Sequence, residues 1–147
     1  MSVDVLTEIV IDVPRKLVSE FAADPVNAPQ WYANIRSVEW VAPPPPIVGA
    51  RAAFVAHFLG RRLTYTYDVV DAVPGERLVM RTAQGPFPME TTYTWEDHEG
   101  GTRMTLRNRG EPSGFSRIGA PLLAAAVGRA NKQDLARLKA LLEEGAR

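Results

Sequence analysis

The chain contains few side chains that could carry acid–base or metal chemistry. Its 147 residues include 2 histidines and no cysteine, which excludes disulfides, thiolate metal sites and cysteine nucleophiles. The strand pattern puts His57 on the outer face of the expected sheet and His98 in a turn. Separated histidines without nearby inward carboxylates do not form a ligand cluster. We therefore expect no metal ion and no cofactor.

Hydroxyl and amide groups remain as the candidate functional groups. Strand alternation and helical spacing direct one polar set toward the interior, namely Thr82, Thr91, Asn108, Asn131 and the hydroxyls of Tyr65, Tyr67 and Tyr93. Such groups can orient a ligand oxygen, but Thr91 and Asn108 could equally satisfy each other by a cross-strand hydrogen bond. In the same way, Asn131 could hold a buried water instead of a ligand.

Carboxylic acids are scarce on the expected inner face. None of those in the third, sixth and seventh strands points inward. Asp71 is the exception, because the register puts it opposite Leu78. It lies beside a turn, where a strand face is poorly defined, and we expect a solvated side chain there.

Three turn signals, at residues 59–62, 73–76 and 98–101, divide the segment 49–110 into antiparallel strands. Directly opposed residues of an antiparallel pair point to the same face, so each turn predicts a set of neighbours. The predicted inner-face pairs are Phe58–Leu63, Ala56–Tyr65, Phe54–Tyr67, Ala52–Val69, Val69–Met80, Tyr67–Thr82, Trp95–Met104, Tyr93–Leu106 and Thr91–Asn108. The predicted outer-face pairs are His57–Thr64, Ala53–Asp68, Asp68–Arg81 as a salt bridge, and Glu96–Arg103. The sheet should therefore have an aromatic inner face and a charged outer face.

The flanking elements should cover that inner face. The expected elements are a strand at 7–13 ending at Pro14, a short helix to about residue 23, a second short helix with Trp31 and Tyr32, and a strand at 37–41. The prolines at 43–46 and the stretch 111–114 should be loops. A helix from about 120 to 144 carries Leu123, Val127, Leu135, Leu138 and Leu142 at helical spacing. This helix should lie on the sheet.

Length and composition predict one domain spanning residues 1–147. Lys plus Arg equals Asp plus Glu at 17 each, so no long-range field favours nucleic acid or an anionic membrane surface. The most apolar stretch, 120–127, is far shorter than the roughly 20 residues that a membrane span needs. We expect a soluble cytoplasmic protein, a monomer or weak homodimer, with no nucleic-acid partner and no stable membrane insertion.

The order of these elements resembles the START-like superfamily (SRPBCC) and its helix-grip fold, in particular the polyketide cyclase/dehydrase and lipid-transport group. The resemblance covers essentially the whole chain and rests on residues 11–14, Asp24-Pro25, Trp31, 46–51, 100–104 and 135–143. It implies an α+β fold, in which a curved antiparallel sheet of about seven strands wraps around a long C-terminal helix, with two short helices after the first strand. It also implies an elongated cavity between sheet and helix.

The resemblance assigns the lining of that cavity to the inner-face residues. The candidate ligand-binding residues are Phe54, Phe58, Tyr65, Tyr67, Met80, Met89, Thr91, Tyr93, Trp95, Met104, Leu106 and Asn108 from the strands, Leu123, Val127 and Asn131 from the helix, and Trp31 near the entrance. The same aromatic residues could instead fill a solid core, since both uses bury them. Periodicity identifies the buried face without showing that space remains inside it.

The leading functional hypothesis is a non-catalytic binder or carrier of a small hydrophobic molecule such as a lipid, quinone or polyketide-like compound. The alternative is a cyclase, aromatase or dehydratase in which Tyr65, Tyr93 or Asn108 orients an enolate. A second alternative is a protein-interaction module. Folds of this kind host many functions, so the resemblance alone selects none of the three.

Overall fold

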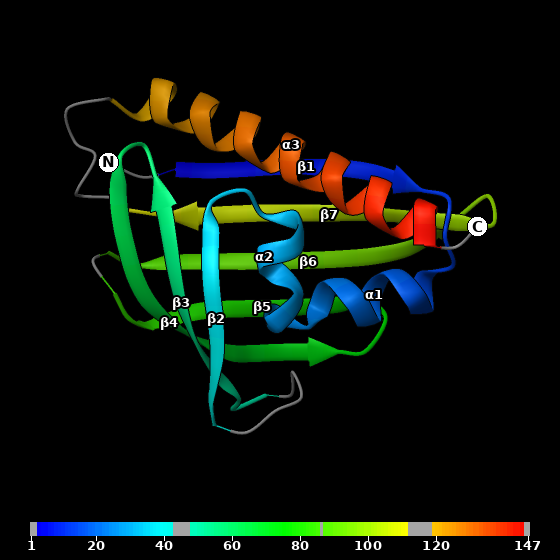
Figure 1. Cartoon of the computed structure of the whole chain (residues 1–147), viewed down its shortest axis with the longest axis horizontal. Helices are drawn as coiled ribbons and strands as arrows, with labels where there is room; N and C mark the ends of the chain where they lie inside the picture. Colours follow the sequence, from blue (N-terminus) through cyan, green and yellow to red (C-terminus); the bar gives the residue numbers. More distant parts are fainter. Residues whose placement is uncertain (1–2, 43–47, 86, 112–118, 146–147) are drawn as a thin grey trace.

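One seven-stranded antiparallel sheet forms the frame of the molecule, and a long helix lies across one of its faces (Figure 1). The structure is a computed structural model that describes residues 3–42, 48–85, 87–111 and 119–145. The strands are β1 (Val3–Ile11), β2 (Ile35–Ala42), β3 (Arg51–Phe58), β4 (Arg61–Val73), β5 (Arg77–Gln84), β6 (Met89–His98) and β7 (Gly101–Gly110). The helices are α1 (Arg15–Ala23), a 3-10 turn (Pro25–Asn27), α2 (Ala28–Trp31) and α3 (Ala120–Gly145). This arrangement confirms the predicted helix-grip fold.

The strands follow the order β1-β7-β6-β5-β4-β3-β2, so β1 and β2 form the two edges. Figure 1 shows the sheet curving strongly, with β2 and β3 running across the direction of β6 and β7. Element boundaries differ slightly from the sequence prediction: the first strand covers 3–11 instead of 7–13, and β2 covers 35–42 instead of 37–41. The predicted loops at 43–46 and 112–114 lie outside the described residues.

The β3–β4 hairpin has a different register from the predicted one. Its turn contains two residues, Leu59 and Gly60, both with positive φ, instead of the expected four-residue loop. Phe58 therefore lies opposite Arg61, and Phe54 opposite Tyr65, which shifts every predicted partner by two residues. Because side chains alternate with a period of two, this shift changes the neighbours and leaves the inner face as predicted.

A bulge in β4 changes the expected strand partner of Asp71, whose side chain is solvent-accessible as expected. The register shifts between Val69 and Asp71, so Asp71 pairs with Val79 and not with Leu78. Its carboxylate accepts a hydrogen bond from Arg77 at the protein surface. A bulge adds one residue to a strand and turns the side chains that follow.

Ion pairs cover the outer face of the sheet, in partly different pairings from those predicted. Asp68 lies opposite Arg81, as predicted, but no salt bridge joins them. Asp68 instead binds Arg51 of β3 at 2.6 Å, while Arg81 binds Glu90 of β6 at 2.7 Å. The predicted Glu96–Arg103 pair is confirmed, at 2.9 Å.

α3 covers the inner face and is fixed along its C-terminal half. Leu123, Leu135 and Leu138 are buried, which confirms the apolar stripe of the helix. Four polar contacts then tie this half to the frame: Asp134 accepts from Ala33 N–H, Arg137 donates to Gln30 O, Lys139 donates to Val10 O, and Glu143 accepts from Asp12 N–H. Within the described residues, no helix is both long and apolar enough to cross a membrane.

β1 and β7 approach each other closely at Gly101. A Cβ atom on this residue would lie 2.5 Å from the carbonyl oxygen of Ile11. The next residue, Thr102, is buried and donates a hydrogen bond to Val13 O at 2.7 Å. Glycine at position 101 therefore lets the chain that leaves β1 cross close to β7 before entering α1.

Candidate ligand-binding cavity

A cavity of about 180 Å³ lies between the inner face of the sheet and α3. Its walls come from residues of all seven strands, from the connections between α2 and β2 and between β5 and β6, and from residues 123–134 of α3. An apolar cavity of about 150 Å³ is large enough to bind benzene. Packing of the aromatic side chains therefore leaves real space beneath the helix.

Most of the residues predicted from the sequence lie in the cavity wall. These are Phe54, Phe58, Tyr65, Tyr67, Met80, Met89, Thr91, Tyr93, Asn108, Leu123, Val127 and Asn131. The others, Trp31, Trp95, Met104 and Leu106, are buried in the packed core beside the cavity. Trp31 was expected near an entrance, yet it is only 1% exposed and packs on Tyr32. Contact of any of these residues with a ligand stays a prediction.

Several lining residues were not among the predicted ones: Val3, Tyr32, Asn34, Ile35, Ala56, Leu63, Phe87, Arg109, Gly110, Ala130 and Asp134. Ala56 and Leu63 already belonged to the predicted inner face. Asp134 follows Asn131 by three residues and Val127 by seven, the spacing of one helix face. Helical spacing could thus have found Asp134.

Three aromatic rings form one wall of the cavity, at the β3–β4 hairpin. Phe54 and Tyr65 stack with nearly parallel planes, their centroids 5.2 Å apart. Tyr67 meets both rings edge-on, at 5.3 Å from Phe54 and 5.1 Å from Tyr65. Offset-stacked and edge-on contacts are the favoured geometries of aromatic pairs, so this wall is rigid and flat-sided.

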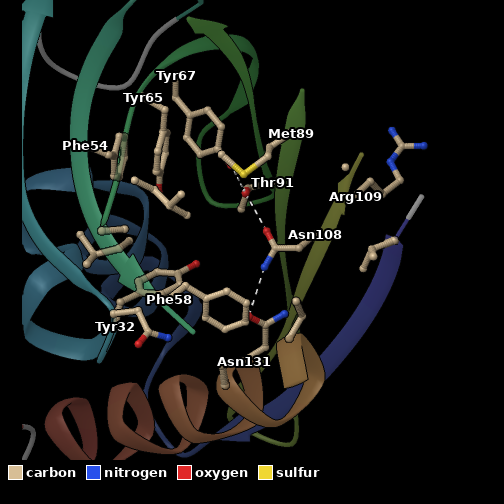
Figure 2. Close-up of a pocket in the computed structure, with 18 of the residues that line it drawn as sticks. Tyr32, Phe54, Phe58, Tyr65, Tyr67, Met89, Thr91, Asn108, Arg109 and Asn131 are labelled. Atoms are coloured by element: carbon tan, nitrogen blue, oxygen red, sulfur yellow. Dashed lines mark hydrogen bonds between the residues drawn. The ribbon is translucent and has the colours of Figure 1, made fainter. Parts of the chain in front are cut away.

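A chain of hydrogen bonds leads from Tyr67 of this aromatic wall across β6 and β7 to α3 (Figure 2). Thr91 donates to Asn108 Oδ1 at 2.7 Å, and Asn108 Nδ2 donates to Asn131 Oδ1 at 3.1 Å. The Tyr67 hydroxyl lies 2.8 Å from Thr91 Oγ1, and it must be the donor because Thr91 has already given its single proton to Asn108. The predicted cross-strand bond between Thr91 and Asn108 is confirmed.

Asn131 ends this chain with an unused donor. Its Nδ2 is buried and has no hydrogen-bond partner among the described residues. Burial also raises the pKa of Tyr67 to about 12, while its bond to Thr91 acts in the opposite direction. All members of the chain are therefore neutral near physiological pH.

A second pair of hydroxyls lies nearer to α2. Tyr32 and Tyr93 place their hydroxyl oxygens 2.7 Å apart. Burial is the main reason why the pKa values of both phenols are raised above their usual value. The indole ring of Trp31 packs against both, at 4.2 Å from Tyr32 and 5.8 Å from Tyr93. This contact keeps the pair in one orientation.

Asp134 supplies a carboxyl group to the same region of the wall. It is 3% exposed, and its Oδ1 accepts a hydrogen bond from Ala33 N–H at 3.0 Å. Burial raises the pKa of Asp134 to about 6, and the Ala33 bond and the charge of Arg137 only partly oppose this shift. Among the described lining residues it is the one carboxylic acid. It can therefore exchange a proton near neutral pH, which general acid–base chemistry requires.

Arg109 is the one cationic residue among the described lining residues, and its charge is used elsewhere. Its guanidinium donates to Glu90, which also binds Arg81. Figure 2 shows the side chain of Arg109 directed away from Asn108 and Asn131. The described wall thus offers no free positive charge to an anionic ligand.

Residues 2–143 match the sequence profile of the family described as polyketide cyclase / dehydrase and lipid transport. A comparison with curated protein sequences finds no match. Three solved structures of similar fold are the Zhui aromatase/cyclase from Streptomyces sp. R1128, a START superfamily protein from Mycobacterium smegmatis and ginseng major latex-like protein 151 from Panax ginseng.

The aromatase/cyclase is 18% identical with a TM-score of 0.80, and the alignment covers 100% of this chain and 97% of that one. The Mycobacterium protein is 14% identical with a TM-score of 0.80, over 96% and 97% of the two chains. The ginseng protein is 11% identical with a TM-score of 0.77, again over 96% and 97%. At these identities the structures support the fold alone. The match over residues 2–143 shows that this chain belongs to the polyketide cyclase/dehydrase and lipid transport family.

Proposed function

We propose that the protein binds a small hydrophobic molecule, such as a lipid, quinone or polyketide-like compound, between α3 and the sheet, and that it acts as a binder or carrier. The observation that carries this proposal is the apolar cavity of about 180 Å³, which has neutral hydroxyl and amide groups along one wall. Burying apolar surface drives association at roughly 25 cal/mol per Å², and a few placed polar groups orient the ligand. The cavity volume favours compounds of one or two rings.

A second candidate function is catalysis, and Asp134 is the specific observation in its favour. Its carboxylate could remove the proton next to the carbonyl of a β-hydroxy ketone. The C–OH bond then breaks, and the proton held by Asp134 passes to the departing hydroxyl, which leaves as water. A phenol or amide on the wall would hold the developing enolate oxygen. The products are an unsaturated ketone and one water molecule, and no co-reactant is needed.

Native mass spectrometry of the purified protein, followed by extraction of whatever it carries, tests the first proposal. The same protein is then incubated with 3-hydroxy-1-tetralone, which becomes 1-naphthol when it loses water. A binder holds one equivalent of the probe and returns it unchanged. An enzyme releases 1-naphthol, at a rate that rises with pH through about 6 and is lost in Asp134→Asn.

The outcomes separate the candidates. A discrete carried compound, or one bound probe released unchanged, supports the binder. Turnover that survives Asp134→Asn would remove Asp134 from the catalytic candidate. An empty protein whose melting temperature does not respond to a panel of hydrophobic compounds contradicts both proposals and favours a protein-interaction role.

A further inference from the structure

The hydroxyl groups of the cavity wall differ in whether they already have a partner. Those on the described part of the wall belong to Tyr32, Tyr65, Tyr67, Thr91 and Tyr93. Tyr67 binds Thr91, Thr91 binds Asn108, and Tyr32 binds Tyr93. Tyr65 is left over, because its hydroxyl has no partner among the described residues. Figure 2 shows its ring between Phe54 and Tyr67, with the hydroxyl end directed into the space that the lining residues enclose.

Tyr65 remains a donor at physiological pH. Burial is the main reason that the pKa of its phenol is raised well above the usual value, and nearby Tyr67 and Tyr93 act in the same direction. A neutral phenol presents one O–H donor. A hydroxyl that already has a protein partner must give up that bond to bind a ligand, whereas the Tyr65 hydroxyl has none to give up. A ligand that brings an acceptor oxygen to this point therefore gains a hydrogen bond that a pure hydrocarbon does not.

The charged groups around the cavity favour a neutral ligand over an anionic one. Arg109 is bound to Glu90, so it cannot balance an anion inside the cavity. Asp134 carries a carboxyl group on the described wall and would repel a carboxylate ligand. A neutral acceptor bonded to carbon, the carbonyl oxygen of a ketone or quinone, satisfies these conditions. The flat face formed by Phe54 and Tyr65 suits a ring.

We propose that Tyr65 is the ligand-orienting donor of this cavity and that the ligand is a neutral one- or two-ring compound whose carbonyl oxygen accepts the Tyr65 hydrogen bond. This inference rests on the proposed binding function. It distinguishes Tyr65 from Tyr93 and Asn108, whose polar groups are engaged with other side chains. Asn131 Nδ2 is a second unused donor on the wall, and because Tyr65→Phe leaves it in place, a comparison of wild type with this variant reports on Tyr65 alone.

A pair of probes that differ in one group tests the assignment. 1-Tetralone and tetralin share two rings, and only the former has a carbonyl oxygen. Their dissociation constants are measured by calorimetry for the wild type, for Tyr65→Phe and for the control Thr64→Val, which removes a hydroxyl from the exposed outer face of the same strand. The difference in hydration of the two probes is the same for all three proteins, so it cancels when the ratio of the two constants is compared between proteins.

We expect the wild type to favour 1-tetralone relative to the Tyr65→Phe protein by about tenfold in that ratio, the effect of one hydrogen bond. Thr64→Val should leave the ratio within about twofold of wild type, because Thr64 is exposed and does not line the cavity. Infrared difference spectroscopy provides a readout that needs no variant. The carbonyl stretch of bound, ¹³C-labelled 1-tetralone should lie below its frequency in an apolar solvent, and should return to that frequency in Tyr65→Phe.

Each result has one meaning. If both probes bind and Tyr65→Phe leaves the ratio unchanged, the assignment of Tyr65 is overturned while the binding function stands. If Thr64→Val lowers the ratio as much as Tyr65→Phe, the effect is a general change in the strand and not the loss of a direct bond from Tyr65, and the inference fails. If neither probe binds the wild type, the proposed function itself is contradicted.

Discussion

The carboxyl group of Asp134 is almost fully buried, and charging it in this position costs free energy. Burial raises its pKa from 3.8 to about 6. A carboxyl group whose pKa is higher in the folded chain binds its proton more tightly there, so folding is favoured at low pH and this contribution is lost as the pH rises through about 6. Each pKa unit corresponds to about 1.4 kcal/mol, which bounds the effect at about 3 kcal/mol.

We predict that Asp134→Asn removes this pH dependence. Between pH 5 and pH 7.5 the free energy of unfolding of the wild type should fall by about 1 kcal/mol more than that of the variant, because the rest of the effect is already lost below pH 5. The asparagine carbonyl can still accept the bond from Ala33 N–H. Urea denaturation of both proteins at the two pH values measures the difference.

Glu144→Gln is the matched control, since it removes a carboxylate from the exposed surface of the same helix. It should follow the wild type. The carboxyl groups of Asp4, Asp68 and Glu90 have lowered pKa values because of their arginine partners, so they lose their contributions only at more acidic pH. Parallel pH curves for the wild type and Asp134→Asn would show that Asp134 is not charged in a buried site.

At the residue scale, the sequence predicted cross-strand partners within the β6–β7 hairpin, but not the contacts that a side chain makes with distant elements. Thr91 and Asn108 could be placed opposite each other because the β6–β7 turn gives only one register. The engaged state of Tyr93 could not be predicted, since its partner Tyr32 lies 61 residues away in a connection without regular spacing. The helical spacing of α3 places Asp134 on the same face as Val127 and Asn131. The more prominent pattern on this helix is the apolar stripe of leucines, which predicts a buried face but not a buried acid.

At the scale of single elements, the residues at each turn determined whether the register of its hairpin could be predicted. The β6–β7 hairpin follows the expected register from its turn, because the Gly-Gly sequence fixes the position of the bend. In the β4–β5 hairpin the expected pairs Val69–Met80 and Tyr67–Thr82 form, but the bulge shifts the pairing by one residue between them and the turn. The β3–β4 turn has only one glycine, and the two-residue solution requires Leu59 to adopt a φ of 50°. Leucine rarely takes that conformation, so a longer loop was the natural expectation.

We predict that Gly101→Ala destabilises the junction between β1 and β7. The added Cβ would lie 2.5 Å from Ile11 O, and a backbone atom cannot move aside as a flexible side chain can. Overpacking of this kind costs about 1 to 3 kcal/mol. Gly145→Ala is the control, because nothing lies within 4 Å of a Cβ there. Thermal unfolding of the two variants should therefore differ, and equal melting temperatures would show that β1 and β7 can separate freely at Gly101.

At the scale of the whole molecule, the fold could be predicted from the sequence and the cavity could not. Turn positions and apolar periodicity determine which faces meet. Whether space remains between those faces depends on how closely α3 packs over the aromatic wall. Differences of fractions of an ångström in that packing decide whether a cavity is left. The open volume is therefore a result of the structure and not of the pattern.

We predict that filling the cavity from the helix abolishes ligand binding without disrupting the fold. Val127→Phe adds a ring at the wall, whereas Ala125→Phe adds one on the exposed side of the same helix. At 100 times its dissociation constant, a ligand stabilises a protein by about 2.7 kcal/mol, or roughly 5 to 10 °C in melting temperature. With 1-tetralone, Ala125→Phe should show this shift and Val127→Phe should not. A shift retained by Val127→Phe would place the ligand elsewhere.

The division of α3 into two halves has a consequence for how this protein could diverge. The contacts that anchor the helix lie at residues 134–143, whereas Val127 and Ala130 only border the cavity. Neither of these two belongs to the strand ladder, so a change there alters the room available to a ligand and leaves the sheet register intact. Descendants of one ancestral chain could thus acquire different ligand sizes by single substitutions, with little loss of folding stability on the way.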